Sequence, residues 1–344
     1  MKRRAALALL GAGLVARPAL SQDRTLVDSA GRKIVLRASI QRLFVAGPPA
    51  SVLAYVLDRD AMVGWVRTPS PAEKAFLTGP ARDLPETGRL TGRGDTVSLE
   101  RLIAAKPDLV LDFGSVAPTY VSLADRVQSQ TGIPYVLIDG RFASTATSLK
   151  LAGDVLGRAE RAADLAAYAE ASFAMVDGVL ARVPADRRPR AYLARGPEGL
   201  ETGSRGSINT EIIERVGAVN VAEGVAGSGN MANVSLEQII AWQPDVIVTL
   251  DRAFFTTVKS KPGWSQVRAI ADNRVYLAPS LPWGWIDAPP SLNRLIGLRW
   301  LLSVFYPAEA RIDLRSETRE FYRLFYGVDP TDDQLAQLLG GAAN

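Results

Sequence analysis

The chain has 344 residues, with 40 Lys and Arg against 36 Asp and Glu, and it contains neither histidine nor cysteine. Without these two residue types it cannot form a disulfide framework, a thiolate metal site, a Cys or His nucleophile or a Ser-His-Asp triad. At roughly 150 residues per domain, the length predicts two lobes, each large enough to bury its own core.

The N-terminus has the pattern of an export signal. Basic residues at 2–4 precede an apolar run over 5–16 and a small-residue pattern at 19–21. We predict that residues 1–21 are a cleavable signal peptide and, because no cysteine follows, that the exported protein is not lipid-anchored; the general and the twin-arginine routes both fit. Removing this segment takes away four basic residues and leaves 36 basic against 36 acidic ones. This balance predicts that nucleic acid is not a partner.

Residues 22–157 alternate between strand and helix patterns, which is typical of a parallel sheet covered by helices on both faces. We predict an N-terminal α/β lobe over this range. Its predicted strands are 42–46, 61–66, 109–113 and 135–138, and its predicted helices include 51–57 and 121–131.

A long amphipathic helix is predicted over 158–183. Apolar residues recur there at spacings of three and four, from Leu165 to Leu180, which places them on one face of a helix. At 1.5 Å per residue this helix is about 39 Å long. A rigid helix therefore joins the two halves of the chain.

Residues 184–344 repeat the same alternation, so we predict a second, C-terminal α/β lobe. Its predicted strands are 190–194, 246–250 and 275–278, and its predicted helix is 210–216. The tail from Leu292 onward has helical patterns, and we expect these C-terminal helices to pack on the lobes.

One segment occurs twice, 137 residues apart. Residues 98–111 and 235–248 are identical at seven of fourteen positions. In each copy a Ser precedes a helical pattern and Pro-Asp leads into an apolar strand, so Ser98 and Ser235 are predicted helix N-caps. The repeat indicates two lobes of similar construction.

These features together resemble the periplasmic substrate-binding proteins of ABC importers that take up ferric siderophores, haem, vitamin B12, molybdate or tungstate. The resemblance covers nearly all of the chain after the predicted signal. It rests on the repeated Ser-Leu-Glu…Pro-Asp unit, the long helix, and the segments 203–220, 281–300 and 320–328.

The resemblance implies a class III periplasmic binding protein: two Rossmann-like lobes with parallel sheets, joined by a single long α-helix, with ligand held between them. It implies a periplasmic monomer that delivers its ligand to a two-subunit permease driven by an ATPase. By position in the repeated motif, Glu100 and Glu237 would dock onto that permease; the alternative is that each only stabilises the first turn of its helix.

Ligand sites in α/β proteins lie at the carboxyl ends of the strands. We therefore expect the loops after the predicted strands to hold the ligand, with arginines that suit carboxylates, hydroxamates, catecholates or oxyanions, and tryptophans that could wall an apolar chelate. After residues 42–46, Gly47-Pro48-Pro49 leads into a helix whose N-terminal amides could meet an anion. The candidate ligand-binding residues are Arg67, Arg93, Phe113, Ser115, Arg195, Arg205, Arg252, Trp283 and Trp285.

We expect no cofactor and no enzymatic activity. Phosphate-loop, dinucleotide-binding and nucleophile-elbow motifs do not occur in the sequence, and without histidine a bare Zn²⁺ or Mn²⁺ site lacks its usual ligands. A metal would therefore arrive as a chelate or an oxyanion. A ferric siderophore is our first prediction, and molybdate or tungstate is the alternative, because residues 289–294 and 321–326 look closest to the branch that contains oxyanion binders.

Overall fold

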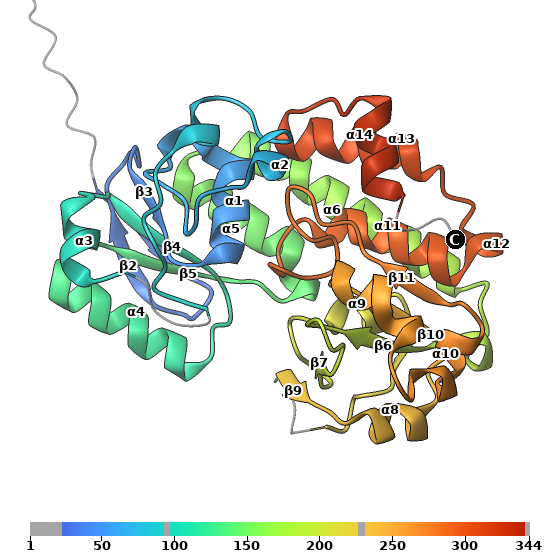
Figure 1. Cartoon of the computed structure of the whole chain (residues 1–344). Coiled ribbons are helices and arrows are strands. Elements are labelled where there is room, and N and C mark those ends of the chain that lie inside the picture. Colours follow the sequence, from blue (N-terminus) through green and yellow to red (C-terminus); the bar gives the residue numbers. More distant parts are fainter. Residues whose placement is uncertain (1–22, 93–96, 226–230, 341–344) are drawn as a thin grey trace, which may run out of the picture.

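The computed structural model describes residues 23–92, 97–225 and 231–340, which form two α/β lobes side by side (Figure 1). The N-terminal lobe has a parallel sheet of order β3-β4-β5 and a separate antiparallel pair, β1 and β2. Its strands are β1 Arg24–Val27, β2 Lys33–Leu36, β3 Leu43–Val45, β4 Leu109–Gly114 and β5 Tyr135–Asp139. Its helices are α1 Pro48–Asp58, α2 Pro71–Lys74, α3 Leu99–Ala104, α4 Pro118–Thr131 and α5 Thr145–Leu156.

The C-terminal lobe has a parallel sheet of order β11-β10-β6-β8 and an antiparallel pair, β7 and β9. Its strands are β6 Arg190–Ala194, β7 Glu201–Gly203, β8 Val219–Asn220, β9 Met231–Asn233, β10 Val246–Thr249 and β11 Val275–Leu277. Its helices are α7 Glu211–Arg215, α8 Leu236–Trp242, α9 Arg252–Thr257 and α10 Arg268–Ala271. The predicted fold class, two α/β lobes with parallel sheets, is confirmed.

The strands of the parallel sheets are largely apolar because both faces of each sheet are covered. All residues of β10 are buried, as are those of β5. Parallel pairing aligns the strands so that Val110 lies beside Tyr135 and Ile247 beside Val275. The carboxyl ends of each sheet therefore meet at one edge, where the following loops gather.

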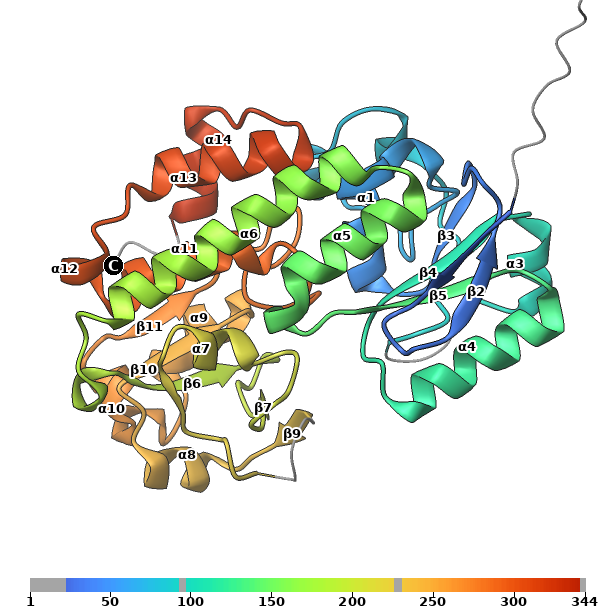
Figure 2. The same ribbon diagram turned by 180° about the vertical axis from the view of Figure 1, so that it is seen from behind.

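Helix α6, Ala159–Leu180, connects the two lobes and runs along one side of both (Figure 2). Its 22 residues correspond to about 33 Å. It packs closely against α5, because Gly153 lies where a Cβ would come 2.3 Å from the Cβ of Ala162. On its other side it contacts α11, Arg294–Phe305.

The C-terminal segment returns to the N-terminal lobe. It contains α11, α12 Pro307–Ala310, α13 Leu314–Phe321, a turn of π-helix over Tyr322–Tyr326, and α14 Asp332–Leu339. The carbonyl of Tyr326 accepts hydrogen bonds from the hydroxyl of Tyr55 on α1, at 3.2 Å, and from Arg59 directly after α1, at 2.9 Å. The tail thus packs on the lobes, as expected, and ties one to the other. In the described part of the chain, no helix has the length and apolar character needed to cross a membrane.

The two copies of the repeated segment have equivalent surroundings. The hydroxyls of Ser98 and Ser235 each accept the N3 amide of their helix, which confirms both N-caps. The residues that follow the two helices also match in conformation and in pairing. Lys106 and Gln243 have φ of 47° and 44°, and the amides of Asp108 and Asp245 each donate, at 2.8 Å, to the carbonyls of Arg42 and Arg190 respectively.

The predicted strand over 61–66 is wrong. Its backbone meets β3 only through the Leu43–Met62 bridge, and it then pairs through Trp65 with Glu86. Close packing of Gly64 against the Pro85 carbonyl, 2.7 Å from where a Cβ would lie, directs the chain away from the sheet. The segment thereby carries Trp65 and Arg67 to the mouth of the space between the lobes.

Candidate functional site

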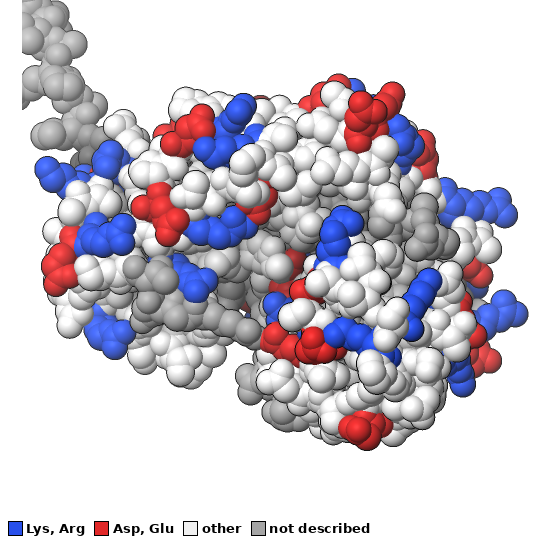
Figure 3. All heavy atoms as spheres, in the orientation of Figure 1, with Lys and Arg blue, Asp and Glu red and all other residues white. Residues whose placement is uncertain are grey.

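A cleft of about 1180 Å³ lies between the lobes and is lined by residues of both. Figure 3 shows the hollow, with basic and acidic side chains on either side of it. The loops after β3, β4 and β5 form one wall, and the loops after β6 and β11 form much of the other. The lining therefore comes from the carboxyl edges of both sheets, where the sequence predicted it.

Five of the predicted ligand-binding residues line this cleft: Arg67, Phe113, Ser115, Arg195 and Trp283. Segments far apart in sequence supply them, from the first lobe, the second lobe and the loop before α11. The structure thus brings these side chains to one cavity, and their contact with ligand remains a prediction.

Trp285 does not line the cleft. Its ring is fully buried, and its indole nitrogen donates to the hydroxyl of Tyr322 at 3.3 Å. Gly284, between the two tryptophans, approaches the Asp287 carbonyl so closely that a Cβ would lie 1.9 Å from it. This tight turn sends Trp283 to the cleft and Trp285 to the core.

Arg205 and Arg252 do not line the cleft either. Arg205 pairs with Glu223 on the surface of the C-terminal lobe. Arg252 is the first residue of α9 and is exposed, because the helix begins with Asp251 as its N-cap. The prediction for Arg93 falls outside the described residues.

Carboxylates pair with the arginines of the cleft. Arg67 bonds Glu73 at 2.5 Å, Arg141 bonds Asp139 at 2.7 Å, and Arg195 lies 3.2 Å from Asp287. Burial alone would raise the pKa of Asp139 and Glu73, but the hydrogen bonds from their arginines hold both pKa values below the usual range. Among the described lining residues there are four arginines and four acidic residues, so this described part of the lining is formally neutral.

Asp112 lies at the base of the N-terminal wall. Burial raises its pKa to about 6, although hydrogen bonds from Tyr135 and Thr91, at 3.1 and 3.2 Å, act to lower it. The carboxyl group therefore titrates near neutrality inside the cleft. Within the described residues, no group of three or more Asp and Glu side chains is placed to hold a bare metal ion.

Aromatic rings form the apolar part of the lining. Trp65 and Trp283 lie with ring centroids 6.2 Å apart, and Tyr55 and Tyr326 support Trp283 from behind at 5.4 and 5.0 Å. Prolines complete this surface: Pro48, Pro49, Pro69, Pro282, Pro289 and Pro290. A flat or bulky apolar ligand would find extensive contact here.

The prolines also change what the helix ends can bind. Pro48 and Pro49 occupy the first positions of α1, and Pro118 is the first residue of α4. Proline has no backbone N–H, so α1 lacks the first two amide donors of its N-terminus and α4 lacks the first. The helix after Gly47 therefore offers amides only from Ala50 onward, and binding of an anion at this end stays a prediction.

Sequence reasoning missed several lining residues, notably Trp65, Asp139, Arg141 and Asp287. A signal for two of them was present: Asp139 and Arg141 directly follow the predicted strand 135–138, at the edge where ligand was expected. Asp287 could not have been found in this way, because the turn that buries its side chain depends on tertiary packing.

Glu100 and Glu237 occupy equivalent places in the two lobes, each in the first turn after its capping serine. Hydrogen bonds from Ser98 and the local backbone lower the pKa of Glu100, and the backbone and Ser235 lower that of Glu237. Both side chains are exposed. Each lobe thus presents an exposed carboxylate at the equivalent position of the repeated segment.

Comparison with known proteins now decides the family, because the sequence model of periplasmic binding proteins matches residues 68–281. The chain belongs to the periplasmic binding protein family. Its members and this chain's relatives are the substrate-binding components of ABC importers rather than enzymes, so the protein binds a small ligand outside the cytoplasm and hands it to a transporter.

Two curated relatives and one solved structure are similar to this chain. The molybdate-binding protein MolA of Haemophilus influenzae is 27% identical over 92% of this chain and 94% of its own length. A cobalamin-binding protein of Halobacterium salinarum is 29% identical over 64% of this chain and 57% of its own. An ABC transporter solute-binding protein of Sulfurospirillum deleyianum has a TM-score of 0.84 at 28% identity, covering 92% of this chain and 99% of its own.

Proposed function

We propose that the cargo of this importer component is a bulky metal chelate of low net charge, in particular a ferric siderophore of the hydroxamate type. The observation that carries this proposal is the lining of the cleft. Its volume of about 1180 Å³ exceeds the ~300–1,000 Å³ of most ligand pockets, and its arginines and carboxylates balance. A large neutral ligand suits such a lining better than a small dianion.

Burial of the paired side chains strengthens this argument. A bare oxyanion would have to draw Arg195 away from Asp287, whose side chain is fully buried, and would leave an unpaired buried charge behind. A neutral chelate can instead accept hydrogen bonds from the outer N–H groups of the arginines while the ion pairs stay intact. The cobalamin-binding relative also takes a large metal complex by name.

Molybdate or tungstate is the second candidate, favoured by the similarity to MolA over nearly the whole chain. In this chain the proline-blocked ends of α1 and α4 argue against it, since a tetrahedral anion depends on a dense set of N–H donors.

The deciding experiment uses the intrinsic fluorescence of Trp65 and Trp283. The purified protein is titrated with ferrichrome as a neutral ferric hydroxamate, with cyanocobalamin, and with molybdate, tungstate and sulfate. We expect saturable quenching by ferrichrome, diminished in Trp283→Phe and retained in Trp264→Phe, whose ring packs against Phe254 inside the C-terminal lobe. Saturation by molybdate alone would establish the oxyanion alternative, and binding of none of the probes would reject both candidates.

The remaining properties follow the same proposal. Metal is carried only inside the ligand, with no cofactor of the protein's own, and the protein acts as a periplasmic monomer after removal of residues 1–21. Glu100 and Glu237 dock onto basic residues of a permease dimer, one on each subunit. Their equivalent positions in two similar lobes suit a partner with two equivalent surfaces.

A further inference from the structure

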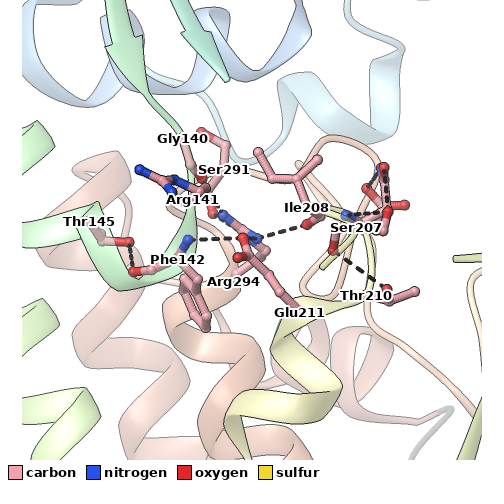
Figure 4. A network of polar contacts seen from close by, with 12 residues as sticks. Gly140, Arg141, Phe142, Thr145, Ser207, Ile208, Thr210, Glu211, Ser291 and Arg294 are labelled. Carbon is pink, nitrogen blue, oxygen red and sulfur yellow. Dashed lines mark hydrogen bonds and ion pairs between the residues drawn. The ribbon is translucent and has the colours of Figure 1, made fainter. Parts of the chain in front are cut away.

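Arg294 is a charged residue placed where the lobes meet. It is the first residue of α11, and only 1% of its side chain is exposed. Figure 4 shows its guanidinium surrounded by polar groups that come from both lobes. A buried arginine requires hydrogen-bond acceptors for its donors, so the identity of those acceptors indicates what it holds together.

The acceptors lie on opposite sides of the interface. On the N-terminal side Arg294 donates to the carbonyl of Gly140 at 2.8 Å, and its guanidinium lies 4.5 Å from the ring centre of Phe142. On the C-terminal side it donates to the carbonyl of Ile208 at 2.9 Å and to Glu211 Oε1 at 2.6 Å. The same Glu211 oxygen accepts the amide of Phe142 at 2.9 Å, which closes the link between the lobes.

These contacts lie directly behind the lining of the cleft. Asp139 and Arg141 line the cleft, whereas the carbonyl of Gly140, between them, accepts a hydrogen bond from Arg294. Ile208 likewise lines the cleft, and its carbonyl accepts a hydrogen bond from the same guanidinium. One side chain therefore contacts the backbone of both walls.

We propose that Arg294 is a positioning residue which, with Glu211, forms a clasp across the floor of the cleft and fixes the separation of the lobes before ligand binds. The planar guanidinium holds three acceptors in different directions, which an ammonium group on a flexible stem cannot do with the same geometry. This role is independent of which cargo the cleft takes.

The same helix provides a matched comparison. Arg299 is also buried, pairs with Glu317 at 2.5 Å, and lies 4.3 Å from the ring centre of Tyr168. It also donates to the hydroxyl of Ser172, on α6, at 2.6 Å. It therefore resembles Arg294 in burial, charge and ring contact, but its partners belong to α6 and α13 and do not line the cleft.

The test measures the distance between the lobes in the ligand-free protein by electron spin resonance. Because the chain has no cysteine, nitroxide labels at Gln130→Cys on α4 and Asp272→Cys after α10, both exposed positions, report a single pair. The clasp is removed in Arg294→Met with Glu211→Gln, which avoids leaving one buried charge unpaired and keeps an acceptor for Phe142. The comparison variant is Arg299→Met with Glu317→Gln.

We expect the distance distribution to become at least twice as broad in the clasp variant and to keep its native width in the Arg299 variant. Arg294→Lys, which retains the charge, should give an intermediate width and keeps the test decisive if the double variant does not fold. A native distribution in the clasp variant, or in Arg294→Lys when only that protein folds, would overturn the proposal, as would equal broadening in the Arg299 variant.

Discussion

At Asp112, burial and hydrogen bonding act in opposite directions on one carboxyl group, and burial prevails, with a pKa of about 6. Between pH 4 and 6 the folded protein then holds a proton that the unfolded chain releases, so this residue's contribution to stability falls as the pH rises. The shift from 3.8 corresponds to a loss on the order of 3 kcal/mol.

Asp112→Asn should remove this dependence. The asparagine stays neutral, and the hydroxyls of Tyr135 and Thr91 can rotate to donate or accept as its amide requires. The free energy of unfolding is measured in urea for both proteins. The variant's value minus the native value should rise by on the order of 3 kcal/mol between pH 4 and pH 7. The exposed Asp272→Asn is the control; curves that stay parallel for Asp112→Asn would contradict the prediction.

The site residues show what local sequence can predict. Arg195 directly follows the predicted strand 190–194, which forms as β6, and it reaches the cleft. Arg67 also reaches the cleft, although the strand predicted before it, 61–66, does not form. Trp283 and Trp285 have nearly the same local sequence, yet only the first faces the cavity. The difference arises from the packing of Gly284 on Asp287 and of Trp285 on Tyr322, which no local pattern contains.

At the scale of elements, the duplicated unit was the most informative feature of the sequence, because its capping serine, glutamate and Pro-Asp stop were all visible. The structure extends this equivalence to the left-handed backbone at Lys106 and Gln243. In contrast, residues 61–66 have a strand-like composition but lie at the edge of the sheet, where a neighbouring loop competes successfully for their hydrogen bonds.

The first turns of helices α3 and α8 each carry one of the two glutamates proposed to dock onto the permease. Glu100→Ala with Glu237→Ala should abolish uptake of whichever probe the protein binds, in cells that rely on this variant, while leaving affinity for that probe unchanged. The carboxylates are exposed and are not among the described residues that line the cleft, so their loss affects transfer rather than capture. Glu160→Ala with Asp333→Ala, which removes exposed first-turn carboxylates from α6 and α14, controls for the helix dipole. Normal uptake by the first variant would exclude the docking role.

For the whole molecule, strand and helix alternation was sufficient to predict two lobes and a rigid connecting helix. The alternation did not predict how many contacts hold the two lobes together. The hydrogen bonds from Tyr55 and Arg59 to the Tyr326 carbonyl join segments 271 and 267 residues apart, and those of the clasp at Arg294 join segments 83 and 154 residues apart. Such contacts depend on the assembled fold, so periodicity within a segment carries no information about them.

These connections limit how far the lobes can move. A hinge made of a few extended segments permits large rotation, whereas here α6, α11 and the C-terminal turn cross between the lobes together. Small-angle scattering should therefore show a radius of gyration that changes by less than about 1 Å when ligand binds, the scale of backbone movement in pre-organised complexes. The variant Arg294→Met with Glu211→Gln should change more than the native protein, because ligand would then have to bring the walls together. A decrease of several ångströms in the native protein would show that α6 and the C-terminal turn bend, and that the lobes close as a hinge.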